Sequence, residues 1–105
     1  MELNSLSAIS PIDGRYRAQV QHLDDYFSEY ALMKYRVLVE IEYLLLLHEK
    51  KIIRLSAKAV KHLNGMKENF GPENAESIKQ IEKTTNHDVK AVEYFIKQEL
   101  ESIGE

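Results

Sequence analysis

One apolar stripe with a helical period constrains the fold of this 105-residue chain more than any other feature. That spacing, one, three or four residues between members, places apolar side chains along one side of an α-helix. We expect this helix to begin near Asp24 and Asp25, whose charges suit a helix N-terminus, and to end within Lys50–Ile52. The members of the stripe are Leu23, Tyr26, Phe27, Tyr30, Met33, Val37, Leu38, Ile41, Leu44 and Leu45.

The length of this helix points to contacts outside the chain. About 26 residues at 1.5 Å each would make it roughly 39 Å long, whereas a sphere formed by a chain of this size is only about 34 Å across. The run Leu44–Leu47 also surrounds the helix, which a one-sided core does not require. We therefore expect more protein to pack there and the isolated chain to self-associate.

Two shorter helices are predicted next. Ser56 suits the N-cap of the first of them, which we expect to end at Gly71-Pro72. Pro72 then suits the first turn of a third, shorter helix. The apolar residues on one face of that helix are Ala75, Ile78 and Ile81.

A fourth helix is predicted to begin at Thr85, because Thr85 and Asp88 fit the Ser/Thr-x-x-Asp/Glu capping pattern. Its inward stripe is expected at Val89, Val92, Phe95 or Ile96, Leu100 and Ile103. Residues 1–17 have no helical period and are expected to form an ordered arm. The predicted fold is therefore all-α: one domain over residues 1–105, with one long helix and about three shorter helices after an N-terminal arm.

Composition excludes several classes of protein. Fourteen Lys and Arg against 17 Asp and Glu give a net charge of −3, which argues against a basic nucleic-acid-binding surface. The most apolar run, Val37–Leu47, contains Glu40 and Glu42 and is shorter than the roughly 20 residues that span a bilayer. Nothing in Met1–Ser10 has the apolar core of a secretory signal. We expect a cytoplasmic protein without membrane partners.

Metal and nucleotide motifs are not found. The chain has no Cys, and none of its His residues belongs to a His-Glu-x-x-His pair, so no metal site is predicted. Phosphate-loop, dinucleotide and nucleophile-elbow patterns are also missing. His22, His48 and His62 are interpreted as surface or helix-flank residues.

Two polar segments remain as candidate sites. Thr84–Asp88 gathers five polar side chains where a helix is predicted to start, and free backbone N–H groups there favour phosphate or carboxylate. The alternative is that Thr85 and Asp88 only cap the helix, with Asn86 in a turn and His87 solvated. In Ser10–Tyr16, Pro11 and Gly14 would hold Arg15, a bidentate donor, next to Tyr16. The alternative there is a turn in which Arg15 pairs with a local acid such as Asp13.

Both segments carry a resemblance to a known family. Ser10-Pro11-Ile12-Asp13-Gly14-Arg15-Tyr16, Phe27-Ser28-Glu29-Tyr30 and the twelve residues Thr84–Phe95 resemble the N-terminal region of bacterial adenylosuccinate lyases, in the fumarase/aspartase superfamily. The resemblance implies an N-terminal helical domain. It also implies that the family's general acid His and catalytic Ser lie beyond Glu105, so that the fragment holds no catalytic residue and is inactive alone.

The resemblance further implies substrates and partners. Lyases of this family eliminate fumarate from adenylosuccinate, giving AMP, and from SAICAR, giving AICAR, in purine biosynthesis, without a metal or organic cofactor. Arg15 and Tyr16 match phosphate-side substrate contacts, and Asn86, His87 and Asp88 match a second substrate-binding stretch. Active sites of the family form between subunits of a homotetramer.

Three questions stay open at this point. His87 could bind substrate or assist proton transfer, and we favour binding because the resemblance assigns the acid and base elsewhere. The chain could instead be a small helical protein-interaction module, but such a module does not need the two polar segments. A sister lyase acting on fumarate adducts of other amines is disfavoured by the twelve-residue motif.

Overall fold

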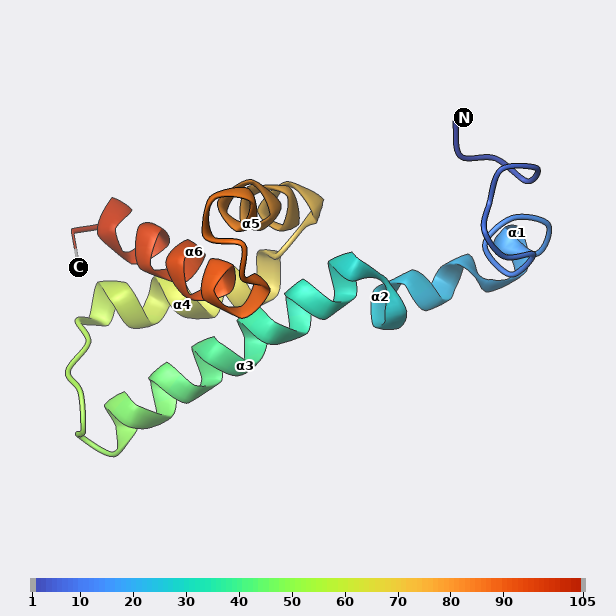
Figure 1. Cartoon of the computed structure of the whole chain (residues 1–105). Helices are drawn as coiled ribbons and strands as arrows, with labels where there is room; N and C mark the ends of the chain where they lie inside the picture. The colour runs from blue at the N-terminus through green and yellow to red at the C-terminus, as the bar shows by residue number, and fades with distance from the viewer. Residues whose placement is uncertain (1, 105) are drawn as a thin grey trace. The chain divides into compact units, whose positions relative to one another are not determined.

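The computed structural model describes residues 2–104, which form helices and connecting turns without a strand (Figure 1). After Leu32 the chain divides into two structural units. The predicted all-α class is confirmed, and among these residues no helix is both long and apolar enough to cross a membrane. In order, the elements are α1 (Arg17–Val20), the 3-10 helix η1 (Gln21–Leu23), α2 (Asp24–Phe27), α3 (Glu29–Glu49), α4 (Ala57–Asn69), α5 (Pro72–Thr85) and α6 (Asp88–Ser102).

The long helix begins and ends close to the predicted residues, but it is interrupted at Ser28. The extended backbone of Ser28 (φ −82°, ψ 167°) separates α2 from the 21-residue α3. Its Oγ accepts the Ala31 N–H at 3.0 Å and donates to the Asp24 carbonyl at 2.6 Å. Ser28 thus caps α3 while it closes α2, because a serine hydroxyl competes with the helical backbone for hydrogen bonds. The predicted long helix is therefore present as α2 and α3, with an interruption at Ser28.

The first members of the predicted apolar stripe are exposed. The exposed fraction is 61% for Tyr26 and 83% for Phe27, whereas Met33, Val37 and Ile41 of α3 are buried. The four residues of α2 make only one turn, which is too short to lay a stripe against a core. The residues of the predicted stripe that are buried in the core therefore begin at Met33.

The core of the second unit lies between α3, α4, α5 and α6. α5 and α6 pack against each other, and the Phe70 ring meets the Phe95 ring edge-on with centroids 6.4 Å apart. Val89 is exposed, so its predicted place in the inward stripe of α6 is wrong, while Phe95 and Ile96 are both buried. The buried residues of this core are Met33, Val37, Ile41, Ala59, Leu63, Ala75, Ile78, Ala91, Val92, Phe95 and Ile96.

Helices α4 and α5 begin at the residues that were predicted from local side chains. Ser56 Oγ accepts the Ala59 N–H at 3.0 Å and caps α4. Pro72 occupies the first position of α5, as predicted. The third helix is not shorter than the second, however, because α5 continues through Thr85 and has 14 residues against 13 for α4.

Among the described residues of the second unit, paired polar side chains connect one helix with another. Arg36 of α3 contacts Asp88 of α6 at 2.8 Å, and His62 of α4 contacts Glu99 of α6 at 3.0 Å. Lys67 of α4 pairs with Glu42 of α3. Such half-exposed pairs contribute little stability each, but they orient one helix against the next.

Candidate functional site

The five predicted site residues lie in two segments, one in each structural unit. Arg15 and Tyr16 precede α1, whereas Asn86, His87 and Asp88 join α5 to α6. All five are exposed. The structure brings together the members within each segment, and each segment has its own set of contacts.

The turn that carries Arg15 is closed by the carbonyl of Pro11. This oxygen accepts the Gly14 N–H at 3.3 Å and the Tyr16 N–H at 2.8 Å. The Arg15 guanidinium lies over the Tyr16 ring, 5.1 Å from the ring centroid, in a cation–π contact. The turn therefore presents a planar cation that is supported by an aromatic ring.

Gly14 is required in this turn by a close approach of the backbone. A Cβ at Gly14 would lie 3.0 Å from Ala8 Cβ and 3.0 Å from the Ser5 carbonyl oxygen. Both distances are tighter than ordinary van der Waals contacts. The residues before Pro11 are thus packed against the turn that holds Arg15.

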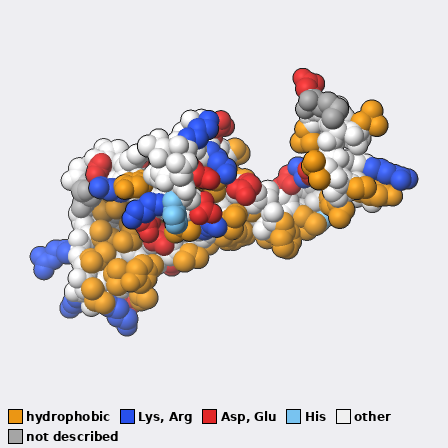
Figure 2. Space-filling model, viewed as in Figure 1, with side chains coloured by type: hydrophobic (Ala, Val, Ile, Leu, Met, Phe, Trp, Pro, Cys, Tyr) orange, Lys and Arg blue, Asp and Glu red, His pale blue; other side chains and the backbone are white. Residues whose placement is uncertain are grey.

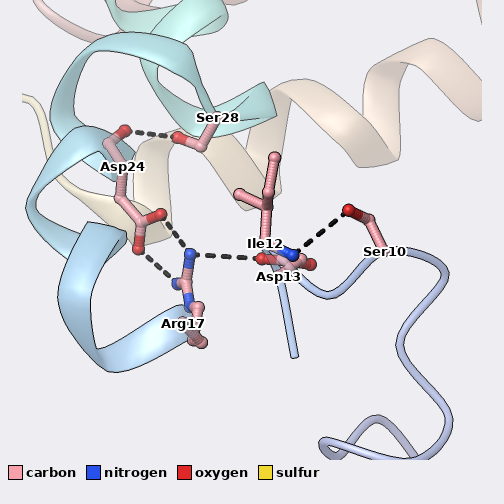
Figure 3. Close-up of polar contacts among 6 residues, drawn as sticks. All are labelled: Ser10, Ile12, Asp13, Arg17, Asp24 and Ser28. Atoms are coloured by element: carbon pink, nitrogen blue, oxygen red, sulfur yellow. Dashed lines mark hydrogen bonds and ion pairs between the residues drawn. The ribbon is translucent and has the colours of Figure 1, made fainter. Parts of the chain in front are cut away.

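Arg17, and not Arg15, binds the acidic side chains of this segment. Its guanidinium makes two bonds to the Asp24 carboxylate, of 2.6 and 2.5 Å, and reaches Asp13 at 3.3 Å (Figure 3). The bidentate contact holds the pKa of Asp24 below its usual range. The alternative in which Arg15 pairs with Asp13 is therefore wrong. Within residues 2–104 no carboxylate forms an ion pair with Arg15.

The joint between α5 and α6 differs from the predicted capping pattern. Asn86 adopts the left-handed conformation (φ 54°, ψ 29°), and its N–H donates to the Glu82 carbonyl at 2.7 Å, which ends α5. Thr85 is the last residue of α5, and its Oγ1 accepts the His87 N–H at 3.3 Å. The prediction that the fourth helix begins at Thr85 is wrong, because α6 begins at Asp88.

His87 is the N-cap of α6. Its Nδ1 accepts the Lys90 N–H at 3.2 Å. In a neutral imidazole with Nδ1 as acceptor, the proton resides on Nε2. The exposed ring therefore combines the capping role with a free hydrogen-bond donor of the kind that binds an anionic oxygen.

Asp88 is held in place by Arg36, a residue that sequence reasoning missed. Asp88 Oδ2 accepts from Arg36 Nη1 at 2.8 Å, and Oδ1 accepts the Val89 N–H at 2.8 Å. The hydrogen bond from Arg36, and after it the bond from the Val89 N–H, holds the pKa of Asp88 below its usual range. In the sequence Arg36 stands with Lys34 within the apolar period of α3, and nothing there relates it to Asp88. A carboxylate bound in this way stays ionised and is poorly suited to accept a proton from substrate.

Removing Arg36 is expected to raise the pKa of Asp88 toward its ordinary value. Because the folded pKa is lowered, the pair stabilises the fold above the unfolded pKa of Asp, and this contribution is lost as the pH falls through the folded pKa. An NMR titration of the Asp88 carboxyl carbon in Arg36→Met measures the change. Arg54→Met, in the loop before α4, is the matched control. An unchanged Asp88 titration in Arg36→Met contradicts the pairing.

Hollows among the described residues of the second unit differ in their lining. One of about 400 Å³ includes Asn86 and is otherwise lined by Lys79, Glu82 and Lys83, of which Lys79 and Glu82 pair with each other at 3.3 Å. Another, of about 460 Å³, has an apolar floor that includes Met66 and Phe95 and contains none of the predicted site residues. Within residues 2–104 no group of three or more His, Asp or Glu side chains could hold a metal ion.

Comparison with known proteins identifies relatives over essentially the whole chain. The chain is 56% identical to an adenylosuccinate lyase from Dictyostelium discoideum over 95% of its length, and 49% identical to one from Escherichia coli strain K12 over 100%. It is 46% identical to the adenylosuccinate lyase of Haemophilus influenzae over 97% of its length. No family model matches the chain.

The relatives are much longer than this chain. It spans 22% of the length of the Dictyostelium protein, 24% of the Escherichia coli protein and 23% of the Haemophilus protein. The predicted resemblance is thereby confirmed, and over its whole length the chain is homologous to about a quarter of adenylosuccinate lyase.

Proposed function

We propose that the chain is the N-terminal part of an adenylosuccinate lyase that eliminates fumarate from adenylosuccinate, giving AMP, and from SAICAR, giving AICAR. The observation that carries this proposal is an identity of 46–56% to three enzymes of that name over 95% or more of the chain. Elimination breaks a C–N bond after a proton leaves the succinyl carbon. The substrate carries a phosphate and two carboxylates, so its recognition requires cations and hydrogen-bond donors.

The Arg15 turn is proposed to bind the substrate phosphate. The acids nearest in sequence, Asp13 and Asp24, are both bound by Arg17, which leaves the Arg15 fork for an external anion. A planar guanidinium can hold two phosphate oxygens at once. The Tyr16 ring packs against the Arg15 guanidinium, and its hydroxyl provides a further hydrogen-bonding group.

The α5–α6 joint is proposed to bind the other end of the substrate. Asn86, His87 and Asp88 are exposed at the start of α6, where the helix dipole favours negative charge. Asp88 is charge-compensated by Arg36, which weakens its repulsion of an anion. The ring of His87 offers Nε2–H as a donor while Nδ1 remains in the cap, so we assign His87 to substrate binding and not to proton transfer.

The assembly and location of the enzyme belong to the same proposal. We propose that the full-length protein is a homotetramer in the cytoplasm and that Arg15, Tyr16, Asn86, His87 and Asp88 contribute to sites completed by other parts of the polypeptide. Self-association of the isolated chain is supported by the apolar side chains that α3 leaves exposed.

The isolated 105-residue chain is expected to be helical yet to release no fumarate from adenylosuccinate, while the full-length protein turns the substrate over. The reason is that the chain supplies binding groups without the acid and base that elimination needs. Circular dichroism establishes helicity, and a coupled fumarate assay compares both proteins with a buffer blank. Turnover by the isolated chain contradicts its assignment as a binding part. A full-length protein that is folded and inactive toward adenylosuccinate and SAICAR contradicts the proposed function.

A further inference from the structure

Helix α3 has a second apolar face that the rest of its unit does not cover. Its members are separated by four, four and three residues, and their exposed fractions are 39, 64, 56 and 47%. This spacing aligns them along one side of the helix. Figure 2 shows hydrophobic side chains gathered along α3. The residues of this face, which we call the outer α3 stripe, are Tyr35, Val39, Tyr43 and Leu46.

The outer α3 stripe lies opposite the side of α3 that enters the core. At 100° per residue, the buried residues Met33, Val37 and Ile41 are centred about half a turn from Val39 and Tyr43. A helix that packs on only one side is polar on the other. α3 therefore has the side-chain pattern of a helix that is covered on two sides.

Two charged residues beside the stripe are already bound to neighbouring helices. Arg36 pairs with Asp88 of α6, and Glu42 pairs with Lys67 of α4. A partner that covers the stripe does not have to bury either charge without a counter-ion, which would otherwise oppose docking. The stripe is thus a continuous apolar surface, and Arg36 and Glu42 beside it each have a counter-ion within the chain.

We propose that the outer α3 stripe is the docking surface for an apolar-faced helix supplied by the part of the lyase polypeptide that this chain does not contain. Apolar residues at intervals of three and four form the seam along which one α-helix packs on another. The chain spans only 22–24% of the relatives' length, so a full-length enzyme has about three times as much further polypeptide from which that helix can come. This inference rests on the proposed function, because it requires the longer enzyme.

Thiol accessibility tests the occupant directly, since the chain has no cysteine of its own. Val39→Cys is placed on the stripe, and Ile52→Cys, in the exposed turn after α3, is the matched control. Both variants are made in the full-length enzyme and in the 105-residue chain. Alkylation by iodoacetamide is followed at each position by peptide mass spectrometry.

We expect Cys at position 39 to react at least about tenfold more slowly in the full-length enzyme than in the 105-residue chain, because docking excludes the reagent. Position 52 should react at similar rates in both. Equal rates at position 39 in the two proteins overturn the proposal. The 105-residue chain is alkylated at concentrations where it is monomeric, because the self-association expected of the isolated chain would also cover exposed apolar residues of α3.

A separate readout distinguishes this inference from the proposed function. The fumarate assay is run on the unmodified full-length protein. Protection at position 39 in a protein without lyase activity supports the docking surface and contradicts the enzyme. Lyase activity together with an accessible position 39 supports the enzyme and overturns the docking surface.

Discussion

Leu63→Ala is expected to lower the free energy of unfolding of the 105-residue chain by about 2–5 kcal/mol. Leu63 is 0% exposed and lies in the α4 face of the core. Truncation removes buried apolar surface and leaves a cavity that the helices can close only in part. Chemical denaturation followed by circular dichroism at 222 nm, a wavelength sensitive to helix, measures the change.

The control for this prediction is Leu46→Ala. Leu46 is 47% exposed and is also within a helix, so the two substitutions change helix propensity equally and differ in burial. Leu46→Ala in the same chain, at protein concentrations where it is monomeric, should cost well under half as much. Equal losses for the two variants would contradict the assignment of the core.

Arg15→Lys in the full-length enzyme is expected to reduce kcat/KM by roughly 10- to 150-fold. The substitution keeps the charge but loses the planar fork that can hold two phosphate oxygens. Loss of one charge-assisted hydrogen bond costs about 1.5–3 kcal/mol, and each 1.36 kcal/mol is about tenfold in rate. Steady-state kinetics with adenylosuccinate, accompanied by thermal melts, measure the effect.

Arg54→Lys is the matched control, because Arg54 is also exposed but lies in the loop before α4. It should leave kcat/KM near the wild-type value. If Arg15→Lys behaves like Arg54→Lys while both proteins melt normally, Arg15 does not bind substrate and is only a surface residue of its turn.

Helix boundaries could be predicted where a local side chain determines them. Ser56 and Pro72 act on backbone groups within three residues, so their effect is visible in the sequence itself. The break at Ser28 is also local, but there the apolar period continues through the break and conceals it. Periodicity reports which side chains share a face and does not report whether the backbone between them is continuous.

The start of α6 could not be predicted because it depends on contacts distant in sequence. Thr85 and Asp88 have the spacing of a capping pattern, yet Asn86 takes the left-handed conformation and His87 becomes the cap. Asp88 is drawn to Arg36, 52 residues away, and is therefore not the residue that completes a cap with Thr85. No pattern along the chain contains that pairing.

The site residues were predicted by type and motif, whereas their partners required the structure. Two arginines, Arg15 and Arg17, stand near Asp13, and sequence spacing did not determine which of them binds it. The structure places the Arg17 guanidinium within hydrogen-bond distance of both Asp13 and Asp24. Arg15 is a candidate to bind substrate because Arg17, two residues further along the chain, binds the carboxylates of both Asp13 and Asp24.

The packing at Gly14 has a practical consequence for how this protein is handled. Ser5 and Ala8 lie against Gly14, and Asn4 Oδ1 accepts the N–H groups of Leu6 and Ser7, so these residues brace the turn that carries Arg15. An expression tag fused directly to the first residues, or a truncation that removes them, would loosen that brace. Under the role proposed for Arg15, such a preparation would bind the substrate phosphate more weakly although Arg15 itself is still present, and a cleavable tag at the other end avoids the artefact.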